Sequence, residues 1–326
     1  MRILITGGSG FIGTNLAQYF SEGGHSVVNF DELPPRNPLH HSFWRKGDLR
    51  QAADVSRAVA EFAPETILHM GARTDLDGKT ADDYAANIGG VANLLNAAAG
   101  NSSVRRVLFA SSMLVCRLGY VPQSDTDYCP NTVYGESKVA GEQLVRTAGA
   151  LPFVWSILRP TSIWGPWFGS PYRSFFNTVR AGAYVHPRGL NTSRTYGFVH
   201  NSVEQIAAIA QSDPALSHER TFYIGDYDPL DLKQWADAIS HVYRQRPVHQ
   251  VPSWVMSLGA AAGDLAKWAG MKHPPLTSFR LRNLVTPAVM NLTNTRQVCP
   301  RLPYDMQAGV ELTIEWLEQE RRRAPA

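Results

Sequence analysis

A tyrosine and a lysine lie four residues apart in the segment Tyr134-Gly135-Glu136-Ser137-Lys138. On a helix, this spacing places both side chains on one face. Two unit charges about 5 Å apart, at an effective dielectric constant of about 20, interact by roughly 3 kcal/mol. An interaction of that size lowers the pKa of a phenol by about two units. The pattern therefore predicts that Tyr134 acts as a general acid or base near neutral pH, assisted by Lys138.

A second polar group follows the apolar run 107–110, which is typical of a buried strand. Ser111 and Ser112 come directly after this run, where strands of open parallel sheets end at the ligand crevice. A hydroxyl at that place can hydrogen-bond a reacting carbonyl or carbinol oxygen. We expect Ser112, more than Ser111, to have this catalytic role.

A glycine-rich loop follows the first apolar run, residues 3–6, and precedes a helical pattern. Glycines let the backbone turn tightly and approach a pyrophosphate, whose charge then lies at a helix N-terminus. Two spacings fit a dinucleotide fingerprint: Gly7, Gly10 and Gly13, or Gly8, Gly10 and Gly13. Both predict a dinucleotide site at the N-terminus of the chain.

Asp31 ends the second apolar run, at about the expected distance beyond the glycine loop. A carboxylate at this place accepts hydrogen bonds from the adenosine ribose and repels a 2′-phosphate. The sequence therefore predicts NAD as the cofactor. Arg36 follows closely and leaves NADP as the alternative.

Strand-like and helical patterns alternate through the first half of the chain, as in doubly wound α/β proteins. The strand-like runs are apolar throughout, as expected of parallel strands buried on both faces. We therefore predict a parallel sheet with helices on both faces, a Rossmann fold. The expected strands are Arg2–Thr6, Ser26–Phe30, Thr66–His69, Arg106–Ser111 and Phe153–Leu158, and the expected helices include Gly10–Ser21, Ala53–Phe62 and Ala81–Ala99.

The regular alternation stops after Leu158, where prolines and glycines interrupt the chain. Short strands are expected at 196–199 and 221–224. We predict an NAD-binding domain of residues 1–163 plus about 195–224. A smaller, mixed α/β substrate domain is predicted from residues 164–194 and 225–326.

Composition excludes several classes of protein. A 44% hydrophobic and 18% charged composition is that of a globular protein. A net charge of +3 without a basic stripe gives no indication of nucleic-acid binding. Three cysteines, Cys116, Cys129 and Cys299, are too few and too scattered for a zinc site or a disulfide framework, which favours the cytoplasm.

The segment Trp254–Met271 is the most apolar stretch of the second half, but Asp264 and Lys267 interrupt it. It is therefore not expected to span a membrane. We interpret it as an amphipathic helix packed against the core, with a helix at a membrane surface as the alternative.

The chain resembles the extended short-chain dehydrogenase/reductase family, in its NAD-dependent epimerase/dehydratase branch, over nearly its whole length. The segment Thr6–Gly13 resembles the family's cofactor fingerprint, which selects Gly7, Gly10 and Gly13. Ser112, Tyr134 and Lys138 match the catalytic serine, tyrosine and lysine. Further resembling segments are Gly47–Leu49, His69–Ala72, Asn87 with its neighbours, Leu158–Pro160, Trp164–Pro166, Arg194–Val203 and Gly309–Leu317.

The resemblance implies a set of residues around the cofactor. These are Gly7, Gly10, Phe11, Ile12, Gly13, Asp31, Asp48, Leu49, Met70, Gly71, Ala72, Ala110, Tyr134, Lys138, Arg159 and Pro160. It also implies a homodimer through the helices of residues 81–99 and 134–148. No metal ion is part of this expectation.

Some positions depart from the family's subgroups. Met113 and Leu114 stand where sugar 4,6-dehydratases carry an acidic pair, which argues against dehydration. Leu114 also replaces the acid cysteine of bifunctional epimerase–reductases. Ser162 replaces an asparagine that is frequent in UDP-hexose 4-epimerases, so the identity of the sugar stays open.

The favoured function is that of a nucleotide-sugar epimerase or oxidoreductase. A sugar diphosphate needs cationic partners, and the candidate substrate residues are Arg73, Ser112, Arg188, Arg194 and Arg280. The alternative is a hydroxysteroid-type dehydrogenase, whose C-terminal region the segments 254–271 and 274–277 resemble. A third possibility, an NAD-sensing protein without catalysis, is disfavoured by the intact Ser112, Tyr134 and Lys138.

Overall fold

The computed structural model describes residues 1–271 and 277–323, apart from the side chains of residues 279 and 280. The chain divides into two compact units, each built from three separate segments. The first unit consists of Met1–Trp167, Gly197–Tyr227 and Asn291–Pro303. The second unit consists of Phe168–Tyr196, Asp228–Met290 and Tyr304–Ala326.

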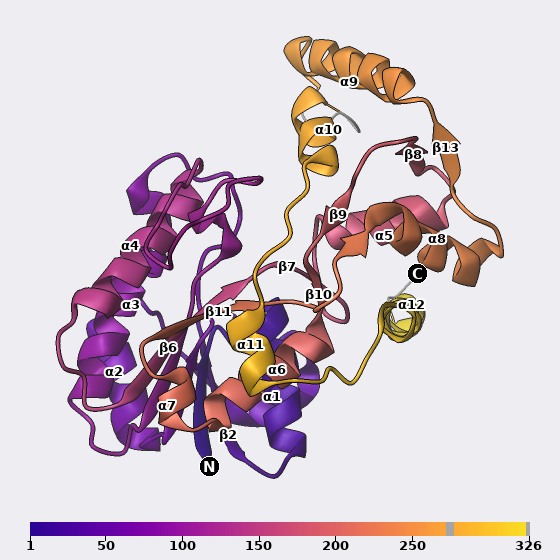
Figure 1. Cartoon of the computed structure of the whole chain (residues 1–326). Helices are drawn as coiled ribbons and strands as arrows, with labels where there is room; N and C mark the ends of the chain where they lie inside the picture. Colours follow the sequence, from indigo (N-terminus) through magenta and orange to yellow (C-terminus); the bar gives the residue numbers. More distant parts are fainter. Residues whose placement is uncertain (272–276, 324–326) are drawn as a thin grey trace. The chain divides into compact units, whose positions relative to one another are not determined.

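A seven-stranded sheet forms the centre of the first unit (Figure 1). Its order is β11-β6-β5-β4-β1-β2-β3, and its strand pairs run parallel. The strand order therefore reverses between β1 and β4: β2 and β3 follow β1 on one side, and β5 and β6 follow β4 on the other. Ligands bind at this reversal point in such sheets. The strands are β1 (Arg2–Thr6), β2 (Ser26–Asp31), β3 (Trp44–Lys46), β4 (Thr66–His69), β5 (Arg106–Ala110), β6 (Val154–Pro160) and β11 (Arg220–Ile224); β7 (Ser162–Trp164) and β10 (Tyr196–Phe198) form a separate pair.

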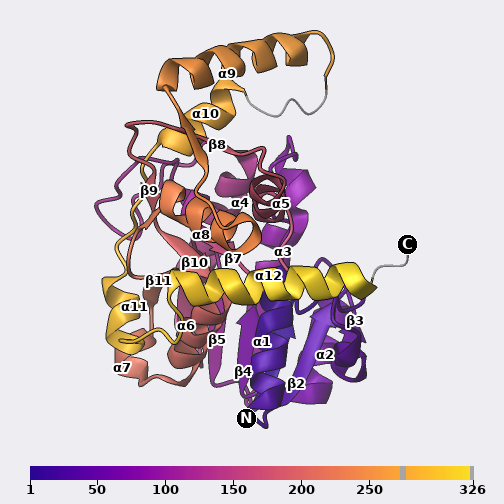
Figure 2. The same ribbon diagram turned by 90° about the vertical axis from the view of Figure 1, so that its right-hand side faces the viewer.

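Helices cover both faces of this sheet (Figures 1 and 2). Strand β1 shows why: Leu4 packs into the core under α2, α3 and α4, whereas Ile3 and Ile5 pack into the core under α1 and α6. The helices are α1 (Phe11–Glu22), α2 (Ala52–Phe62), α3 (Ala85–Ala99), α4 (Val133–Thr147), α6 (Val199–Gln211), α7 (Pro214–Ser217) and α11 (Thr293–Val298), with 3-10 turns η1 (Pro38–Phe43), η2 (Ala81–Tyr84) and η3 (Met113–Val115).

The predicted doubly wound parallel sheet is confirmed. The five strands expected in the first half are present, with ends that differ by two residues or fewer. Strand β3 was not predicted, because its three residues Trp44, Arg45 and Lys46 form no apolar run.

The second unit is a smaller assembly of helices and short strands. Trp235 of α8 is buried at its centre, among the rings of Phe175, Phe176 and Tyr196. Strands β9 and β12 pair antiparallel, and β8 and β13 pair parallel. The elements are α5 (Tyr172–Arg180), β8 (Val185–Pro187), β9 (Ser193–Arg194), β12 (Leu230–Asp231), α8 (Leu232–Arg244), β13 (His249–Val251), α9 (Ser253–Trp268), α10 (Ser278–Val285) and α12 (Met306–Arg323).

The expectation that segment 254–271 forms an amphipathic helix packed against the core holds for one face of the helix. The apolar segment that begins at Trp254 does form a helix, α9, but most of its large apolar side chains are exposed. Only Met256, Ala260 and Gly263 of this helix are buried. Residues 274–276, the other segment with a hydroxysteroid-type resemblance, lie outside the described residues. None of the helices in the described ranges has the length and hydropathy that a bilayer crossing requires.

Candidate active site

The glycine loop connects β1 to α1 and approaches the end of β4. Gly7 has a φ of +68°, and a Cβ atom there would lie 2.5 Å from the Gly71 backbone. A Cβ atom on Gly13 would lie 2.1 Å from the carbonyl oxygen of Gly7. Side chains at these two positions would push the loop away from the sheet. Glycine is therefore required here because the backbone segments lie so close together.

The N-terminus of α1 suits an anion. Its N-cap residue is Gly10, which has no side chain to satisfy the N–H groups of the first turn. Phe11, Ile12 and Gly13 form that turn, so their N–H groups point where a pyrophosphate would lie. The loop and the helix start therefore fit the predicted dinucleotide.

Asp31 lies at the end of β2, beside the glycine loop. Its two oxygens each accept one backbone N–H group, from Ser9 and Leu33, both at 3.0 Å. Burial raises the pKa of its carboxyl group, although these two hydrogen bonds oppose the rise. A carboxylate oxygen has more than one lone pair, so both oxygens can also accept from ribose hydroxyls.

Arg36 is held over the same loop by two backbone carbonyls. Its Nε donates to the oxygen of Ser9 at 3.1 Å, and its Nη1 donates to the oxygen of Trp167 at 2.7 Å. The guanidinium therefore has protein partners of its own, which weakens the case for Arg36 as a dedicated 2′-phosphate ligand.

The other predicted cofactor segments lie at neighbouring strand ends. Asp48 receives hydrogen bonds from Nε of Arg50 at 2.9 and 3.0 Å, and this partner lowers the pKa of the Asp48 carboxyl group. The side chain of Leu49 packs against Gly71. A Cβ atom added to Gly71 would lie 2.4 Å from Cδ1 of Leu49. Met70, Gly71 and Ala72 follow β4, with the Met70 N–H donating to Thr6 at 3.0 Å.

The predicted catalytic residues come from α4 and the end of β5. Thr132 caps α4, accepting the Gly135 N–H at 3.0 Å, and this fixes the first turn that carries Tyr134. Tyr134 and Lys138 are both buried on the same helix. Ser112 lies close enough to Tyr134 for its hydroxyl to lower the pKa of the phenol. The structure therefore brings together the three residues that the sequence predicted.

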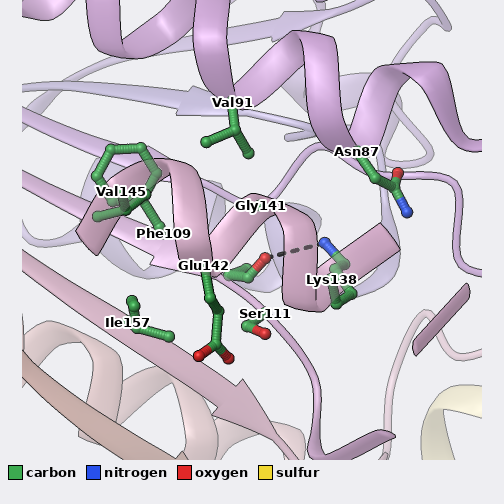
Figure 3. A pocket seen from close by; sticks show the side chains of 10 residues that line it. Asn87, Val91, Phe109, Ser111, Lys138, Gly141, Glu142, Val145 and Ile157 are labelled. Atoms are coloured by element: carbon green, nitrogen blue, oxygen red, sulfur yellow. Dashed lines mark hydrogen bonds between the residues drawn. The ribbon is translucent and has the colours of Figure 1, made fainter. Parts of the chain in front are cut away.

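Lys138 points toward the end of β5. Its Nζ donates to the carbonyl oxygen of Ala110 at 2.9 Å. A dashed line from the Lys138 nitrogen marks a hydrogen bond in Figure 3. Burial lowers the pKa of its ammonium group to about 8, while the negative charge of Glu142 opposes the shift. At neutral pH the lysine still carries its charge, close to the strand end where Ser112 lies.

The predicted effect on Tyr134 was wrong in direction. Burial raises the pKa of Tyr134 to about 12, the hydroxyl of Ser112 opposes the rise, and Tyr84 adds to it. Lys138 does not offset this burial because its Nζ is directed to the Ala110 carbonyl. In the protein alone, Tyr134 is therefore a protonated phenol, ready to act as an acid.

Asn87 of α3 hydrogen-bonds the backbone of the loop that leads into this helix. Its Oδ1 accepts the Arg73 N–H at 2.8 Å, and its Nδ2 donates to the Arg73 carbonyl and to Ser137 Oγ, both at 3.0 Å. The guanidinium of Arg73 pairs with Asp75 at 2.8 Å and lies over the ring of Tyr84. Arg73 is thus engaged in local contacts, although it was predicted to contact substrate.

A buried ion pair lies one turn beyond Lys138. Glu142 receives two hydrogen bonds from Arg159, both at 2.8 Å, and the side chains of the pair are 1% and 0% exposed. Arg159 also donates to the hydroxyl of Tyr223 and to the carbonyl of Asp125. Each of its three guanidinium nitrogens therefore has a partner within the protein. The predicted cofactor contact of Arg159 and Pro160, at the end of β6, would then be made by their backbone.

Sequence reasoning did not identify Glu142. A usable signal was present, because Glu142 follows Lys138 by four residues and thus shares its helix face. Their partners are Ala110, at the end of β5, for Lys138 and Arg159, of β6, for Glu142; both side chains are labelled in Figure 3.

Three of the four arginines proposed for the substrate lie in the second unit. Arg188 is exposed, and the side chain of Arg280 lies outside the described residues. Arg194 is partly buried in β9, where its Nε donates to the Thr286 carbonyl at 3.0 Å. Its Nη2 is buried and has no hydrogen-bond partner within the described part of the chain.

Comparison with known proteins places this arrangement in a family. Residues 3–225 match the model of the NAD dependent epimerase/dehydratase family. The chain belongs to this family. Its cofactor is therefore NAD, and it is an enzyme of the extended short-chain dehydrogenase/reductase type.

The family's relatives differ in what they act on. The chain is 30% identical over 254 residues to a 3-beta-hydroxysteroid dehydrogenase of Mycolicibacterium neoaurum, covering 72% of this chain and 68% of that protein. It is 24% identical over 325 residues to the N-acetyl-alpha-D-glucosaminyl-diphospho-ditrans,octacis-undecaprenol 4-epimerase of Escherichia coli O157:H7, covering 97% and 95%.

A solved structure shows the same fold over nearly the whole chain. The UDP-glucose 4-epimerase of Thermus thermophilus, in complex with NAD, superposes with a TM-score of 0.73. The match has 22% sequence identity and covers 98% of this chain and 99% of that one. The predicted Rossmann fold with a smaller C-terminal domain is thereby confirmed.

Proposed function

We propose that this enzyme uses NAD to oxidise a hydroxyl group of a nucleotide-diphosphate sugar to a carbonyl group, or uses NADH to reduce such a carbonyl group, either as an epimerase or as a net oxidoreductase. NAD would lie on the Gly7–Gly13 loop with its ribose at Asp31, and would supply the hydride acceptor. In an oxidation, Tyr134 would accept the hydroxyl proton as its phenolate, and in a reduction its phenol would donate a proton. Ser112 would hydrogen-bond the reacting oxygen, and Lys138 would supply positive charge at the end of β5.

The observation that carries the sugar-diphosphate proposal is Nη2 of Arg194, which is buried without a hydrogen-bond partner among the described residues although the guanidinium lies beside Tyr196. A buried donor without a partner is costly, and a charged one more so. A diphosphate oxygen would satisfy it with a charge-assisted hydrogen bond. A steroid has no anionic group that could do this.

A thermal-shift screen with NAD present tests the proposal. A ligand at one hundred times its Kd stabilises the folded state by about 2.7 kcal/mol. A nucleotide-diphosphate sugar should raise the midpoint of the wild type and have a much smaller effect on Arg194→Met. The matched control is Arg188→Met, an exposed arginine of the same unit. A midpoint raised equally in both variants would contradict the role of Arg194.

The second candidate is a hydroxysteroid-type dehydrogenase. Two relatives named as 3-beta-hydroxysteroid dehydrogenases, from Mycolicibacterium neoaurum and Mycobacterium tuberculosis, favour it, because each is 30% identical to the chain over 254 or 262 residues. A 3β-hydroxysteroid would then raise the midpoint in the same screen, whereas nucleotide sugars would leave it unchanged. That outcome would replace the sugar proposal.

The residues beside Ser112 bear on the type of reaction. Met113 and Leu114 lie in η3, where the Leu114 N–H donates to Ser112 Oγ at 3.1 Å. Neither side chain can exchange a proton, so we expect no dehydration of a hexose. Mass spectrometry of the product checks this expectation, since a product lighter than its substrate by one water would contradict it.

Asp31 sets the proposed preference for NAD over NADP. Its carboxylate would face the 2′-phosphate, so NAD should bind well over tenfold more tightly than NADP, or by more than about 1.4 kcal/mol. Calorimetric titration of both cofactors measures this, and Asp31→Asn should reduce the difference. Equal affinities in the wild type would refute the assignment.

We also propose a cytoplasmic homodimer that pairs through α3 and α4. Family resemblance supports the dimer, and the unpaired cysteines of the described structure support the compartment. Sedimentation velocity of the purified enzyme tests the dimer. A monomer at micromolar concentration would contradict it.

A further inference from the structure

Helix α9 has two apolar faces, of which one is covered. Met256, Ala260 and Gly263 lie on the buried face, and α10 lies beneath α9 in both ribbon views (Figures 1 and 2). Asp264 accepts the Ser278 N–H at the start of α10, at 3.2 and 3.3 Å. These contacts explain one side of the helix and leave the other to solvent.

The exposed face carries large apolar side chains along the whole helix. Trp254, Leu258, Leu265 and Trp268 are 64%, 63%, 64% and 86% exposed. Their spacings of four, seven and three residues place them on one stripe of a helix. Ala261 falls on the same stripe, so no charged side chain interrupts it. We call these five residues the α9 stripe.

Exposed apolar side chains gathered in this way differ from single ones. Scattered exposed leucines are ordinary on protein surfaces, whereas a contiguous apolar stripe marks an interaction surface. The α9 stripe has a tryptophan near each end, and tryptophan is enriched where an apolar phase meets water. An amphipathic helix that lies in a membrane interface has this composition.

The surrounding charge favours an anionic surface. Segment 253–285 contains four lysines and arginines against one acidic residue, Asp264. Its net charge of +3 equals the formal net charge of the whole chain, so the rest of the protein is balanced. Asp264 is itself engaged by the N-terminus of α10, which leaves the cations of the segment to attract anionic headgroups.

We propose that the α9 stripe docks on the surface of an anionic lipid bilayer, with α9 lying in the plane of the interface. The tryptophans and leucines would enter the headgroup–acyl boundary, and the net positive charge of segment 253–285 would attract the anionic headgroups. This inference does not depend on which substrate the enzyme uses.

Vesicle co-sedimentation with the full-length protein tests the proposal. The probes are unilamellar vesicles of phosphatidylcholine alone and of phosphatidylcholine with phosphatidylglycerol. The wild type should pellet with the anionic vesicles, and salt should weaken this binding by screening its electrostatic part. Tryptophan emission should shift to shorter wavelength as the rings leave water. Protein without vesicles should stay in the supernatant.

A double variant and a matched control locate the surface. Leu258→Glu with Leu265→Glu should weaken vesicle binding by roughly a hundredfold, as two leucines are no longer buried in lipid. Leu39→Glu with Leu76→Glu makes the same charge change at two exposed leucines outside α9, and should weaken it far less. Equal thermal midpoints would show that both variants are folded.

Several outcomes would overturn the proposal. The wild type could stay unbound to anionic vesicles, or the two double variants could lose binding equally. Sedimentation velocity without lipid could also show a dimer that the α9 double variant dissociates. In that case a second copy of the chain, and not a bilayer, covers the α9 stripe.

Discussion

Helices α4 and α9 depart in opposite ways from the usual distribution of polar and apolar residues. Helix α4 buries Lys138 and Glu142, which most helices expose. Helix α9 exposes Trp254 and Trp268, which most helices bury. In α4 the partners of the unusual residues are inside the protein. Glu142 pairs with Arg159, and Lys138 donates to Ala110.

The two helices therefore differ in which residues indicate function: the buried charged residues in α4 and the exposed apolar residues in α9. Buried charges persist where they are paired or needed for chemistry, because an unpaired buried charge is costly. Exposed apolar stripes persist where something outside the chain covers them. Substitutions in α4 should therefore change catalysis and stability, whereas substitutions on the α9 stripe should leave both nearly intact.

The largest effect is expected from Tyr134→Phe. The substitution removes the hydroxyl that would transfer the proton and keeps the buried ring. Turnover should fall by roughly 10²–10⁴, the usual contribution of a positioned acid or base, while calorimetry should find NAD affinity unchanged. Ser112→Ala should cost less. Near-native turnover of Tyr134→Phe would refute the mechanism, and a loss of NAD binding would make Tyr134 a structural residue.

Glu142→Ala should affect stability most. It leaves the guanidinium of Arg159 buried without its carboxylate, which costs about 3–5 kcal/mol. Urea unfolding measures the loss, and Glu136→Ala, at an exposed glutamate of the same helix, serves as the control with a change of about 0.5 kcal/mol or less. The double variant Glu142→Leu with Arg159→Met, which replaces both charges by apolar side chains, should recover most of the stability. If Glu142→Ala lowers the free energy of unfolding no more than the control does, the ion pair is not needed for stability.

Lys138 should make stability depend on pH. Burial lowers the pKa of its ammonium group from 10.5 to about 8 in the folded state. Between these two values the unfolded chain binds more protons, so this group makes the free energy of unfolding rise with pH. The rise is about 3 kcal/mol if the whole shift is realised. The measurement is the free energy of unfolding as a function of pH for the wild type and for Lys138→Met. The difference between the two curves gives the contribution of Lys138, and a difference that stays constant between pH 8 and 10.5 would contradict the shift.

The smallest effect is expected on the α9 stripe. Leu258→Glu or Leu265→Glu should change the free energy of unfolding by about 0.5 kcal/mol or less, because neither side chain is buried. Met256→Ala, on the buried face of the same helix, should cost about 2 kcal/mol or more. Thermal midpoints of the three variants provide the comparison. A large loss at Leu258 would mean that α9 packs against the chain on its outer side after all.

The sequence predicted those features that depend on neighbours along the chain. The strands Arg2–Thr6 and Thr66–His69 are continuous apolar runs, and they were predicted with their observed ends. Tyr134 and Lys138 share a helix face because of their spacing alone. The glycine loop was predicted from its position between a strand and a helix.

Features that depend on distant residues were not predictable in this way. Arg159 lies 17 residues beyond Glu142, and only the packing of α4 on β6 brings them together. The rise in the pKa of Tyr134 depends on burial and on Tyr84, 50 residues earlier. Cys116 and Cys129 looked scattered along the chain, yet their backbones form a parallel β-bridge. The exposure of α9 depends on what the remainder of its unit leaves uncovered.

The sheet order has a consequence for biosynthesis. Strand β6 ends at Pro160, but its outer neighbour β11 begins only at Arg220, after the chain has passed through part of the second unit. At about 5–20 residues per second, a ribosome needs roughly 3–12 seconds to make this interval. During that time the edge of β6 in the nascent sheet is open, because Ile157 and Leu158 have not yet paired with β11. Unpaired edges recruit other chains, so the open edge of β6 exposes the growing polypeptide to aggregation during this interval.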